Sequence, residues 1–371
     1  MLNAIIFLFL FVLILFTLIT YLYLYKQEDE NSFNVSFVLW LLKRFGGNTL
    51  SHLTFLQDKQ LFITNNKSVL LSYRQKGSRL YVLGDPIGSE NKLKDGLDEF
   101  LLFAKTEGKT PVFYQVTEKF LSTFTEKGYK LFKIGEEAKV SLEQFTIEGK
   151  KSGKFRTTLN KFNREGYHFE VVSPPFSKEL LQELRMVSDE WLNGRKEKSF
   201  SVSSFSEEYI SLFPVSLLRD TNKRLIAFAS LPSNYQENAT LSIDLMRYTN
   251  DSPAGAMDMV FISTFIWAKN SGYSSCSLGL SPLSNVGVEE NASLKEKIAR
   301  YAFLNGCRFY NFKGLRNYKA KFATEWSPRY IAYKRVSFIY VILQIISIVK
   351  QEPNSKRLFL SRKFFNQKKA V

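Results

Sequence analysis

Apolar residues are very unevenly distributed along the chain. Residues 3–25 form one apolar run without a charged side chain. As a helix, such a run is long enough to cross the roughly 30 Å hydrocarbon layer of a bilayer. No Lys or Arg precedes it and three tyrosines end it, which favours a retained anchor with an interfacial belt over a cleaved leader. The pattern predicts a transmembrane anchor at residues 1–26.

The charges beside this run suggest an orientation. Lys26, Lys43 and Arg44 all follow the apolar run, the first at the end of the expected anchor and the other two within the expected juxtamembrane linker at 27–45. Because cytoplasmic flanks carry the excess of Lys and Arg, the remainder of the chain is expected on the cytoplasmic side of a cell membrane that it crosses once.

After the linker, short segments in which apolar and polar residues alternate are interspersed with segments of helical periodicity. Residues 68–88 predict two strands around a Lys-Gly turn, and residues 93–108 have helical periodicity that stops at a glycine. Residues 178–192 and 256–272 predict further helices, and residues 239–248 predict a strand. The order is typical of a mixed α/β (α+β) fold.

The length of the chain indicates two domains rather than one. We expect the first at residues 46–148 and a second, catalytic one at 149–335, although no clear internal repeat is visible. Residues 336–371 are expected to form a C-terminal helix and a basic tail. The apolar part of this segment, residues 337–349, is too short to span a membrane comfortably. It fits either a last core helix or a basic segment on a membrane surface.

Composition narrows the classes of chemistry. The 371 residues include 51 Lys and Arg against 35 Asp and Glu, a net charge of +16, which favours polyanionic partners such as nucleic acid or an anionic membrane. With two cysteines, two histidines and no clustered His/Cys spacing, we expect neither a metal site nor a cofactor. With only two histidines in the chain, a histidine general base is also not expected.

One junction, residues 242–261, combines a strand, a Ser-Pro-Ala-Gly loop and a helix, and carries Asp244, Arg247 and Asp258. This layout resembles the GCN5-related N-acetyltransferase fold, without the pattern that cradles the pyrophosphate of acyl-CoA. Asp244 and Arg247 fall on opposite faces of a strand, so one can point to a cavity while the other supports the structure. A purely structural ion pair is the alternative.

Two basic stretches complete the candidates. Residues 312–322 place Lys313, Arg316 and Lys321 away from an apolar helix side, as an anion-binding wall or simply a solvated amphipathic helix would. The second stretch, residues 149–167, carries six cations against a single acid and fits a nonspecific electrostatic surface for nucleic acid or anionic lipid. Its candidate cations are Lys154, Arg156, Lys161 and Arg164.

Many motifs in one order resemble the catalytic domain of bacterial phosphatidylglycerol lysyltransferases, the multiple peptide resistance factors, and their alanyl relatives. The resemblance covers about residues 45–335. The motifs are GGNTLSHLTFLQDK, LGDPIG, GKFRTTLNKFNREGYHFEVVSPP, SDEWL, KEKSFSVSSF, DLMRY, GAMD, LGLSPLSNVG, YNFKGLRNYKAKF and WSPRYIAY. The chain departs from the family pattern at Leu280, Ser281 and Ser327. It also has a single expected anchor where full-length members carry a many-helix domain that moves the lipid product across the bilayer.

The resemblance implies tandem acyltransferase-like domains that transfer an aminoacyl group from aminoacyl-tRNA to the glycerol hydroxyl of phosphatidylglycerol. Lysine is the first expectation for the amino acid, and alanine or arginine stay open. Asp244 would handle a proton or bind the substrate α-ammonium, and Arg247 would meet phosphate or orient Asp244. Asp258 would bind a cationic side chain or serve the helix dipole. Lys313, Arg316, Lys321 and, more weakly, Arg329 would contact tRNA or lipid phosphate.

Two other readings stay open from the residues alone. The same fold could use a glycolipid, a peptidoglycan precursor or an acyl-CoA, although the missing pyrophosphate pattern argues against CoA. A membrane-tethered module could also bind anionic lipid or nucleic acid without catalysis.

Overall fold

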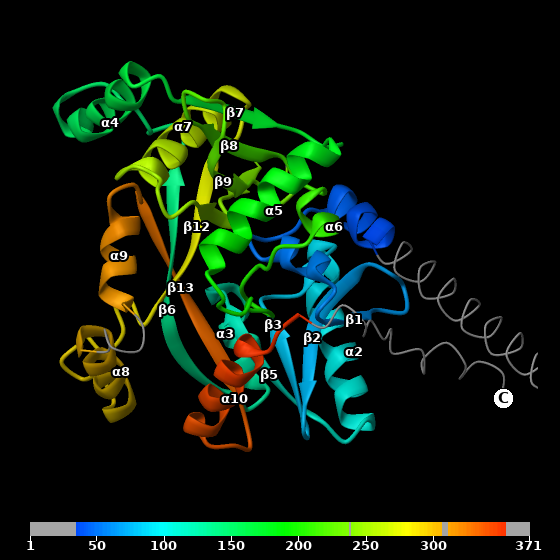
Figure 1. Ribbon diagram of the computed structural model, residues 1–371. Helices are drawn as coiled ribbons and strands as arrows, with labels where there is room; N and C mark the ends of the chain where they lie inside the picture. Colours follow the sequence, from blue (N-terminus) through cyan, green and yellow to red (C-terminus); the bar gives the residue numbers. More distant parts are fainter. Residues whose placement is uncertain (1–34, 237–238, 306–310, 354–371) are drawn as a thin grey trace, which may run out of the picture.

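The computed structural model describes residues 35–236, 239–305 and 311–353. It shows the mixed α/β fold that the sequence predicts, built on two sheets (Figure 1). The predicted anchor at 1–26, part of the linker and most of the basic tail lie outside the described residues. Within the described ranges, no helix combines the length and the apolar character that a membrane span needs.

The larger sheet has nine strands in the order β1-β2-β3-β5-β13-β6-β12-β10, with β4 paired to β2. Its strands are β1 (Gln60–Ile63), β2 (Val69–Lys76), β3 (Arg79–Leu83), β4 (Ile87–Gly88), β5 (Thr110–Val116), β6 (Lys130–Ser141), β10 (Thr240–Ser242), β12 (Ser275–Pro282) and β13 (Glu325–Tyr333). Strand β13, from the end of the chain, lies between β5 and β6 of the first half. The division at residue 148 therefore stays a prediction, since one sheet draws strands from both sides of it.

The smaller sheet is antiparallel, in the order β11-β9-β8-β7. It contains β7 (His168–Val172), β8 (Val215–Arg219), β9 (Leu225–Ser230) and β11 (Met246–Tyr248). The prediction of a single strand at 239–248 is wrong in one respect. The segment forms two strands, β10 and β11, which belong to different sheets. At the crossing, Asp244 N–H donates to the Ser230 carbonyl and Leu245 N–H to Ser230 Oγ, so Asp244 lies between the sheets.

Helices cover both sheets (Figure 1). They are residues 35–45, α2 (Leu93–Thr106), α3 (Leu121–Glu126), α4 (Gly153–Arg164), α5 (Lys178–Leu192), α6 (Glu207–Ile210), α7 (Ala256–Asn270), α8 (Leu294–Asn305), α9 (Phe312–Ala320) and α10 (Phe338–Lys350). The predicted helices at 93–108, 178–192 and 256–272 are confirmed as α2, α5 and α7. Aromatic rings fill the space beneath them: Phe100 of α2 contacts Phe113 of β5, and Phe265 of α7 is buried in another cluster.

The C-terminal segment forms the last core helix that was one of the two alternatives for residues 337–349, although only one side of it is buried. Val341, Ile345 and Ile348 of α10 are buried in the same core cluster as Tyr81 and Phe132, so α10 is a core helix on that side. Its opposite side remains exposed.

Candidate functional site

Asp244 is the centre of a cluster of three hydrogen-bond donors. Ser203 Oγ donates to its Oδ1 over 2.8 Å, and Tyr209 Oη donates to its Oδ2 over 2.6 Å. His52 Nε2 lies 3.3 Å from Oδ1. Only 11% of the Asp244 side chain is exposed, so a substrate group could reach this carboxylate through a small opening only.

His52 comes from the first half of the chain, on a buried 3₁₀ turn, η1 (Ser51–Leu56). Asn48 fixes the start of this turn, because its Oδ1 accepts from the Leu50 N–H and from Ser51 Oγ. The imidazole meets the Phe213 ring edge to face at 6.5 Å. The turn thus presents His52 to Asp244 from the opposite half of the fold.

Electrostatics keep Asp244 ionised. Burial alone would raise the pKa of its carboxyl, but the contacts with His52, Tyr209 and Ser203 hold that pKa below its usual range. The pKa of Tyr209 is raised well above its ordinary value by burial and by the negative charge of Asp244. Tyr209 is therefore a lasting donor, and the centre of the cluster is an anion at neutral pH.

A buried ion pair holds the segment that carries Ser203. The Asp58 carboxylate lies 2.5 Å from Lys59 Nζ and 3.0 Å from Arg74 Nη2. The Phe200 backbone completes the cluster, since its N–H donates to Asp58 and its carbonyl accepts from Lys59. These contacts attach the loop before Ser203 to the first half of the chain.

A second polar cluster lies where β6 and β12 approach closely. Gly135 has φ of 142°, and a Cβ atom there would lie 2.3 Å from the Ser281 carbonyl. The next two residues, Glu136 and Glu137, are buried acids. Glu137 pairs with Arg329 and accepts from Ser277 Oγ over 2.5 Å. Burial opposes this charge, yet Arg329 keeps the pKa of Glu137 low.

Glu136 has its own donors, Lys133 Nζ at 2.8 Å and Asn285 Nδ2 at 2.9 Å. The two clusters are linked through β12, because the Ser277 residue that donates to Glu137 also accepts the Ile243 N–H at its carbonyl. Asp244 follows Ile243 directly, so Ser277 of β12 connects the two acidic centres.

Helix α9 brings two cations to the second cluster. Arg316 Nε donates to Ser284 Oγ over 2.8 Å, and the guanidinium lies over the Trp326 ring at 3.3 Å. Lys319 Nζ donates to the carbonyls of Gly279 and Leu280, and burial lowers its pKa to about 8. Lys319 was not among the residues that the sequence singled out.

The other predicted site residues lie outside the two acidic clusters, and most of them make ion pairs of their own. Arg247 pairs with Glu197 at 3.0 Å and lies over Trp191, so it serves a neighbouring ion pair and has no direct bond to Asp244 in the described structure. Asp258 and Lys321 pair with each other at 2.9 Å. Lys313 is exposed on α9. The roles given to these residues stay predictions.

The basic stretch around α4 is only partly free. Lys154 and Arg164 are exposed on this helix. Lys161 lies over its neighbour Phe162, and Arg156 donates to the carbonyls of Ile147 and Gly149. Arg156 therefore closes the loop before α4, and Lys154 and Arg164 are the better candidates for a phosphate contact.

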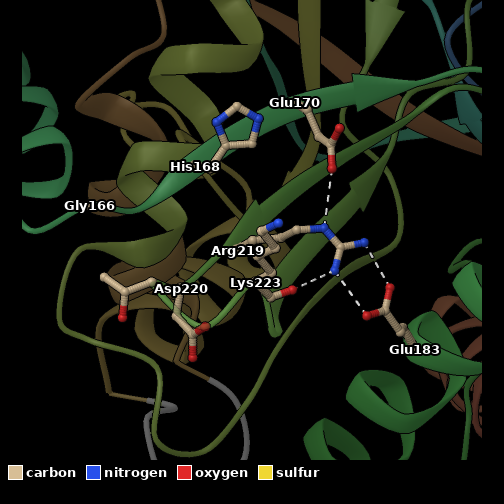
Figure 2. Close-up of a pocket in the computed structure, with 8 residues that line it drawn as sticks. Gly166, His168, Glu170, Glu183, Arg219, Asp220 and Lys223 are labelled. Atoms are coloured by element: carbon tan, nitrogen blue, oxygen red, sulfur yellow. Dashed lines mark hydrogen bonds and ion pairs between the residues drawn. The ribbon is translucent and has the colours of Figure 1, made fainter.

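A charged hollow of about 650 Å³ is lined by residues of β7, of β8 with the turn after it, and by Glu183 of α5 (Figure 2). Its floor is Arg219, which is neutralised by Glu183 at 2.7 Å and Glu170 at 3.2 Å. None of the predicted site residues lines it. In the part of the chain that the structure describes, no group of three His, Cys, Asp or Glu side chains could hold a metal ion.

Comparison with known proteins identifies the family. The model of the family described as phosphatidylglycerol lysyltransferase, C-terminal, matches residues 40–333. The chain belongs to this family. Both acidic centres and α9 lie inside the matched range.

Curated and solved members of the phosphatidylglycerol lysyltransferase family agree with the match. The phosphatidylglycerol lysyltransferases of Staphylococcus aureus (strain COL) and Staphylococcus epidermidis (strain ATCC 35984) are 39% and 38% identical over 313 residues. The match covers 84% of this chain but 37% of each relative, so the chain spans well under half their length. The structure of L-PGS from Bacillus licheniformis is 39% identical with a TM-score of 0.76, covering 85% of this chain and 96% of that one.

A second solved structure, the C-terminal domain of a putative lysylphosphatidylglycerol synthetase from Agrobacterium fabrum, is 31% identical with a TM-score of 0.76 and covers 89% of this chain and 100% of that one. FemX shares 11% identity with a TM-score of 0.51 over 86% of this chain and 98% of that one, a likeness of fold alone. The finer description as tandem acyltransferase-like domains stays a prediction.

Within this lysyltransferase family fold, several site residues had no role in the sequence analysis. His52, Ser203 and Tyr209 around Asp244, and Glu136 and Glu137 beside Arg329, all lie far from Asp244 in the chain. One signal was available, because His52 is one of only two histidines and lies in the motif GGNTLSHLTFLQDK.

Proposed function

We propose that the chain is the catalytic part of an aminoacyltransferase that moves an amino acid, lysine in the first instance, from aminoacyl-tRNA to the glycerol hydroxyl of phosphatidylglycerol. The family match and the names of the relatives support phosphatidylglycerol as the acceptor, and the net charge of +16 accords with a polyanionic donor such as tRNA. The observation that carries the proposal is the nearly buried Asp244 carboxylate, held as an anion beside His52.

The reaction is the exchange of one ester for another. The lipid hydroxyl oxygen forms a bond to the aminoacyl carbonyl carbon and loses its proton. The bond from that carbon to the ribose oxygen of tRNA breaks, and the ribose oxygen takes a proton. Atoms and charge balance without ATP or an oxidant, so the chain must supply a proton carrier, a donor for the oxyanion, and positioning.

Proton transfer falls to His52, with Asp244 as its orienting group. The Asp244 oxygens already accept from Ser203, Tyr209 and His52, which uses most of the four lone-pair positions of a carboxylate. Little capacity remains for a substrate ammonium. An ionised carboxylate bonded to one imidazole nitrogen fixes the ring and stabilises the imidazolium that forms when the other nitrogen takes a proton.

Arg316 and Lys319 are placed to meet an anion. Arg316 makes one hydrogen bond, through Nε, among the described residues, which leaves its two Nη groups for a phosphate or an oxyanion. Trp326 keeps the guanidinium plane in place. Lys319, with its pKa near 8, carries a positive charge at neutral pH that backbone carbonyls orient.

The remaining parts of the proposal concern placement in the cell. We assign residues 1–26 to a single membrane anchor that holds two acyltransferase-like domains, 46–148 and 149–335, on the cytoplasmic side. Confinement to the membrane plane would raise the local concentration of the lipid acceptor. Lys154 and Arg164 on α4 would contact tRNA phosphates, or anionic lipid.

Expression in a bacterium that lacks aminoacylated lipids tests the proposal. Mass spectrometry of the extracted lipids should show a new cationic phospholipid whose mass equals phosphatidylglycerol plus a lysyl group. The His52→Ala chain should accumulate the protein but not the lipid. An unchanged lipid profile at normal expression of the unaltered chain would contradict the proposal.

A further inference from the structure

Two helices at one end of the molecule expose large apolar side chains. Helix α8 presents Leu294, Ile298 and Tyr301, and α10 presents Ile339, Leu343 and Ile346. Each of these side chains is between 44% and 74% exposed. Both sets have the spacing i, i+4, i+7, which gathers the members of each on a single face of its helix. We call these six residues the α8–α10 face.

The α8–α10 face is unusual for a helix surface in water. No residue of α8 is buried. The apolar stripe of this helix therefore contributes little to the core of the described chain. On α10 the stripe lies opposite the buried side that contains Val341 and Ile345. Single exposed apolar residues are ordinary, but stripes on two neighbouring helices mark a binding surface.

The two stripes belong to one surface. Lys295 of α8 lies over the ring of Phe338 at the start of α10, with 5.8 Å between Nζ and the ring centroid. Ala299, in the middle of α8, packs against the core cluster that contains Val341 and Ile345. In Figure 1 both helices lie at the same lower edge of the molecule, with α8 projecting beyond the sheets.

Charge shows which partner fits. Helix α10 has no acidic residue, is preceded by Lys334 and Arg335, and ends at Lys350, which is exposed on the side of its apolar stripe. Helix α8 carries three exposed cations, Lys295, Lys297 and Arg300, against one acid, Glu296. Apolar stripes bordered by cations, together with the amphipathic rings of Tyr301 and Tyr340, match the boundary between anionic headgroups and acyl chains.

The position of the face also fits the site. Helix α8 packs beside α9, the helix that brings Arg316 and Lys319 to the second acidic cluster. A bilayer against α8 would place headgroups close to those two cations, which accords with a lipid acceptor.

We propose that the α8–α10 face docks on an anionic lipid bilayer, with its six apolar side chains at the depth of the upper acyl chains. The inference rests on the proposed function for its purpose, delivery of the lipid acceptor, but its geometry stands independently. Docking would orient the catalytic part in addition to any anchor at residues 1–26.

Depth measurement on the full chain tests the docking. An environment-sensitive fluorescent amino acid is placed at position 298, 343 or 186 of the chain reconstituted in vesicles. Met186 on α5 is a matched control, since it is 71% exposed and lies outside the face. In phosphatidylglycerol vesicles, the probes at 298 and 343 should shift to the blue and be quenched by lipids brominated on the acyl chain. The probe at 186 should do neither, and pure phosphatidylcholine should give little effect at any position.

Three results would overturn the proposal. The probes at 298 and 343 could remain as accessible to water as the probe at 186. They could be quenched equally in phosphatidylcholine, so that anionic lipid has no part. They could be shielded without quenching by brominated lipid, in which case protein covers the face: a second copy if the shielding depends on protein density, and a segment of the same chain if not.

Activity separates this proposal from the proposed function. The double variant Ile298→Glu, Leu343→Glu should lose about tenfold of the transfer rate in vesicles, yet keep it in mixed detergent micelles where docking is not needed. Met186→Glu should match the unaltered chain in both. Probes that enter the bilayer in a chain without transfer activity would refute the function alone, whereas transfer with probes that stay in water would refute the docking alone.

Discussion

His52 Nε2 lies 3.3 Å from Asp244 Oδ1, although the two residues come from opposite halves of the chain. The contact depends on two supports. The η1 turn presents His52, and the Asp58–Lys59 pair attaches the loop that carries Ser203. The proposed chemistry is thus produced by the whole fold and not by one motif.

Tyr209→Phe should move the acidic limb of the activity profile to higher pH. The Tyr209 hydroxyl donates to Asp244 over 2.6 Å and helps to hold the pKa of that carboxyl below its usual range. Without this donor the carboxylate protonates at a higher pH, so activity is lost earlier as the pH falls.

The measurement is kcat/KM for aminoacyl transfer between pH 4 and 7. Tyr81→Phe is a matched control, because the buried Tyr81 hydroxyl has no hydrogen-bond partner among the described residues. Identical acidic limbs for Tyr209→Phe and the unaltered chain would contradict the role given to this donor.

Lys319 should weaken the fold below pH 8 and stop doing so above pH 10.5. Its pKa falls from 10.5 to about 8 because burial disfavours the charged form. Between these values the unfolded chain binds the proton and the folded chain does not, so the free energy of unfolding rises with pH. The difference of 10.5 − 8 = 2.5 pKa units corresponds to about 3 kcal/mol.

Urea unfolding of the unaltered chain and of Lys319→Met at several pH values measures this effect. The difference between the two free energies of unfolding should change in favour of the unaltered chain by about that amount between pH 8 and 10.5. A constant difference would show that Lys319 keeps an ordinary pKa in the fold.

Asp58→Ala should be strongly destabilising, by about 3 kcal/mol or more. It leaves Lys59 fully buried without its counter-charge and removes the acceptor of the Phe200 N–H. Asp95→Ala, which breaks an exposed pair with Lys92, is the control and should leave the unfolding midpoint unchanged. Equal midpoints for the two variants would mean that the buried pair does not hold the Ser203 loop.

Charge removal on α4 should weaken tRNA binding in a salt-dependent way. Lys154→Gln and Arg164→Gln remove two exposed cations, so the slope of log binding constant against log salt should fall by about two for the double variant. Lys109→Gln, a cation outside α4, should leave the slope unchanged. Equal slopes for the double variant and the unaltered chain would exclude α4 from the tRNA surface.

Local patterns explain what the sequence could predict. The helices α2, α5 and α7 follow from apolar periodicity and glycine stops, and the mixed α/β class follows from their alternation with strands. The predicted strand at 239–248 failed because periodicity does not say which sheet a residue joins. The break after Ser242 comes from Ser230, which binds the backbone of Asp244 and Leu245.

The site was harder to predict, since pairing across the fold decides which charges are free. Asp258 and Lys321 were both assigned to substrate, but they neutralise each other. Arg329 was a weaker candidate for phosphate and instead pairs with Glu137, an acid from the first half that no local pattern connects to it. Asp244 was singled out from its motif, yet its partners His52, Ser203 and Tyr209 required the structure.

Transfer from purified lysyl-tRNA, labelled in the amino acid, to phosphatidylglycerol vesicles tests the central claim most directly. The unaltered chain should form labelled lipid, RNase should abolish the transfer, and Asp244→Asn should lower the rate by roughly 100-fold or more while circular dichroism shows an unchanged fold. Transfer that survives RNase and requires an acyl-CoA, or full activity of Asp244→Asn, would contradict the account.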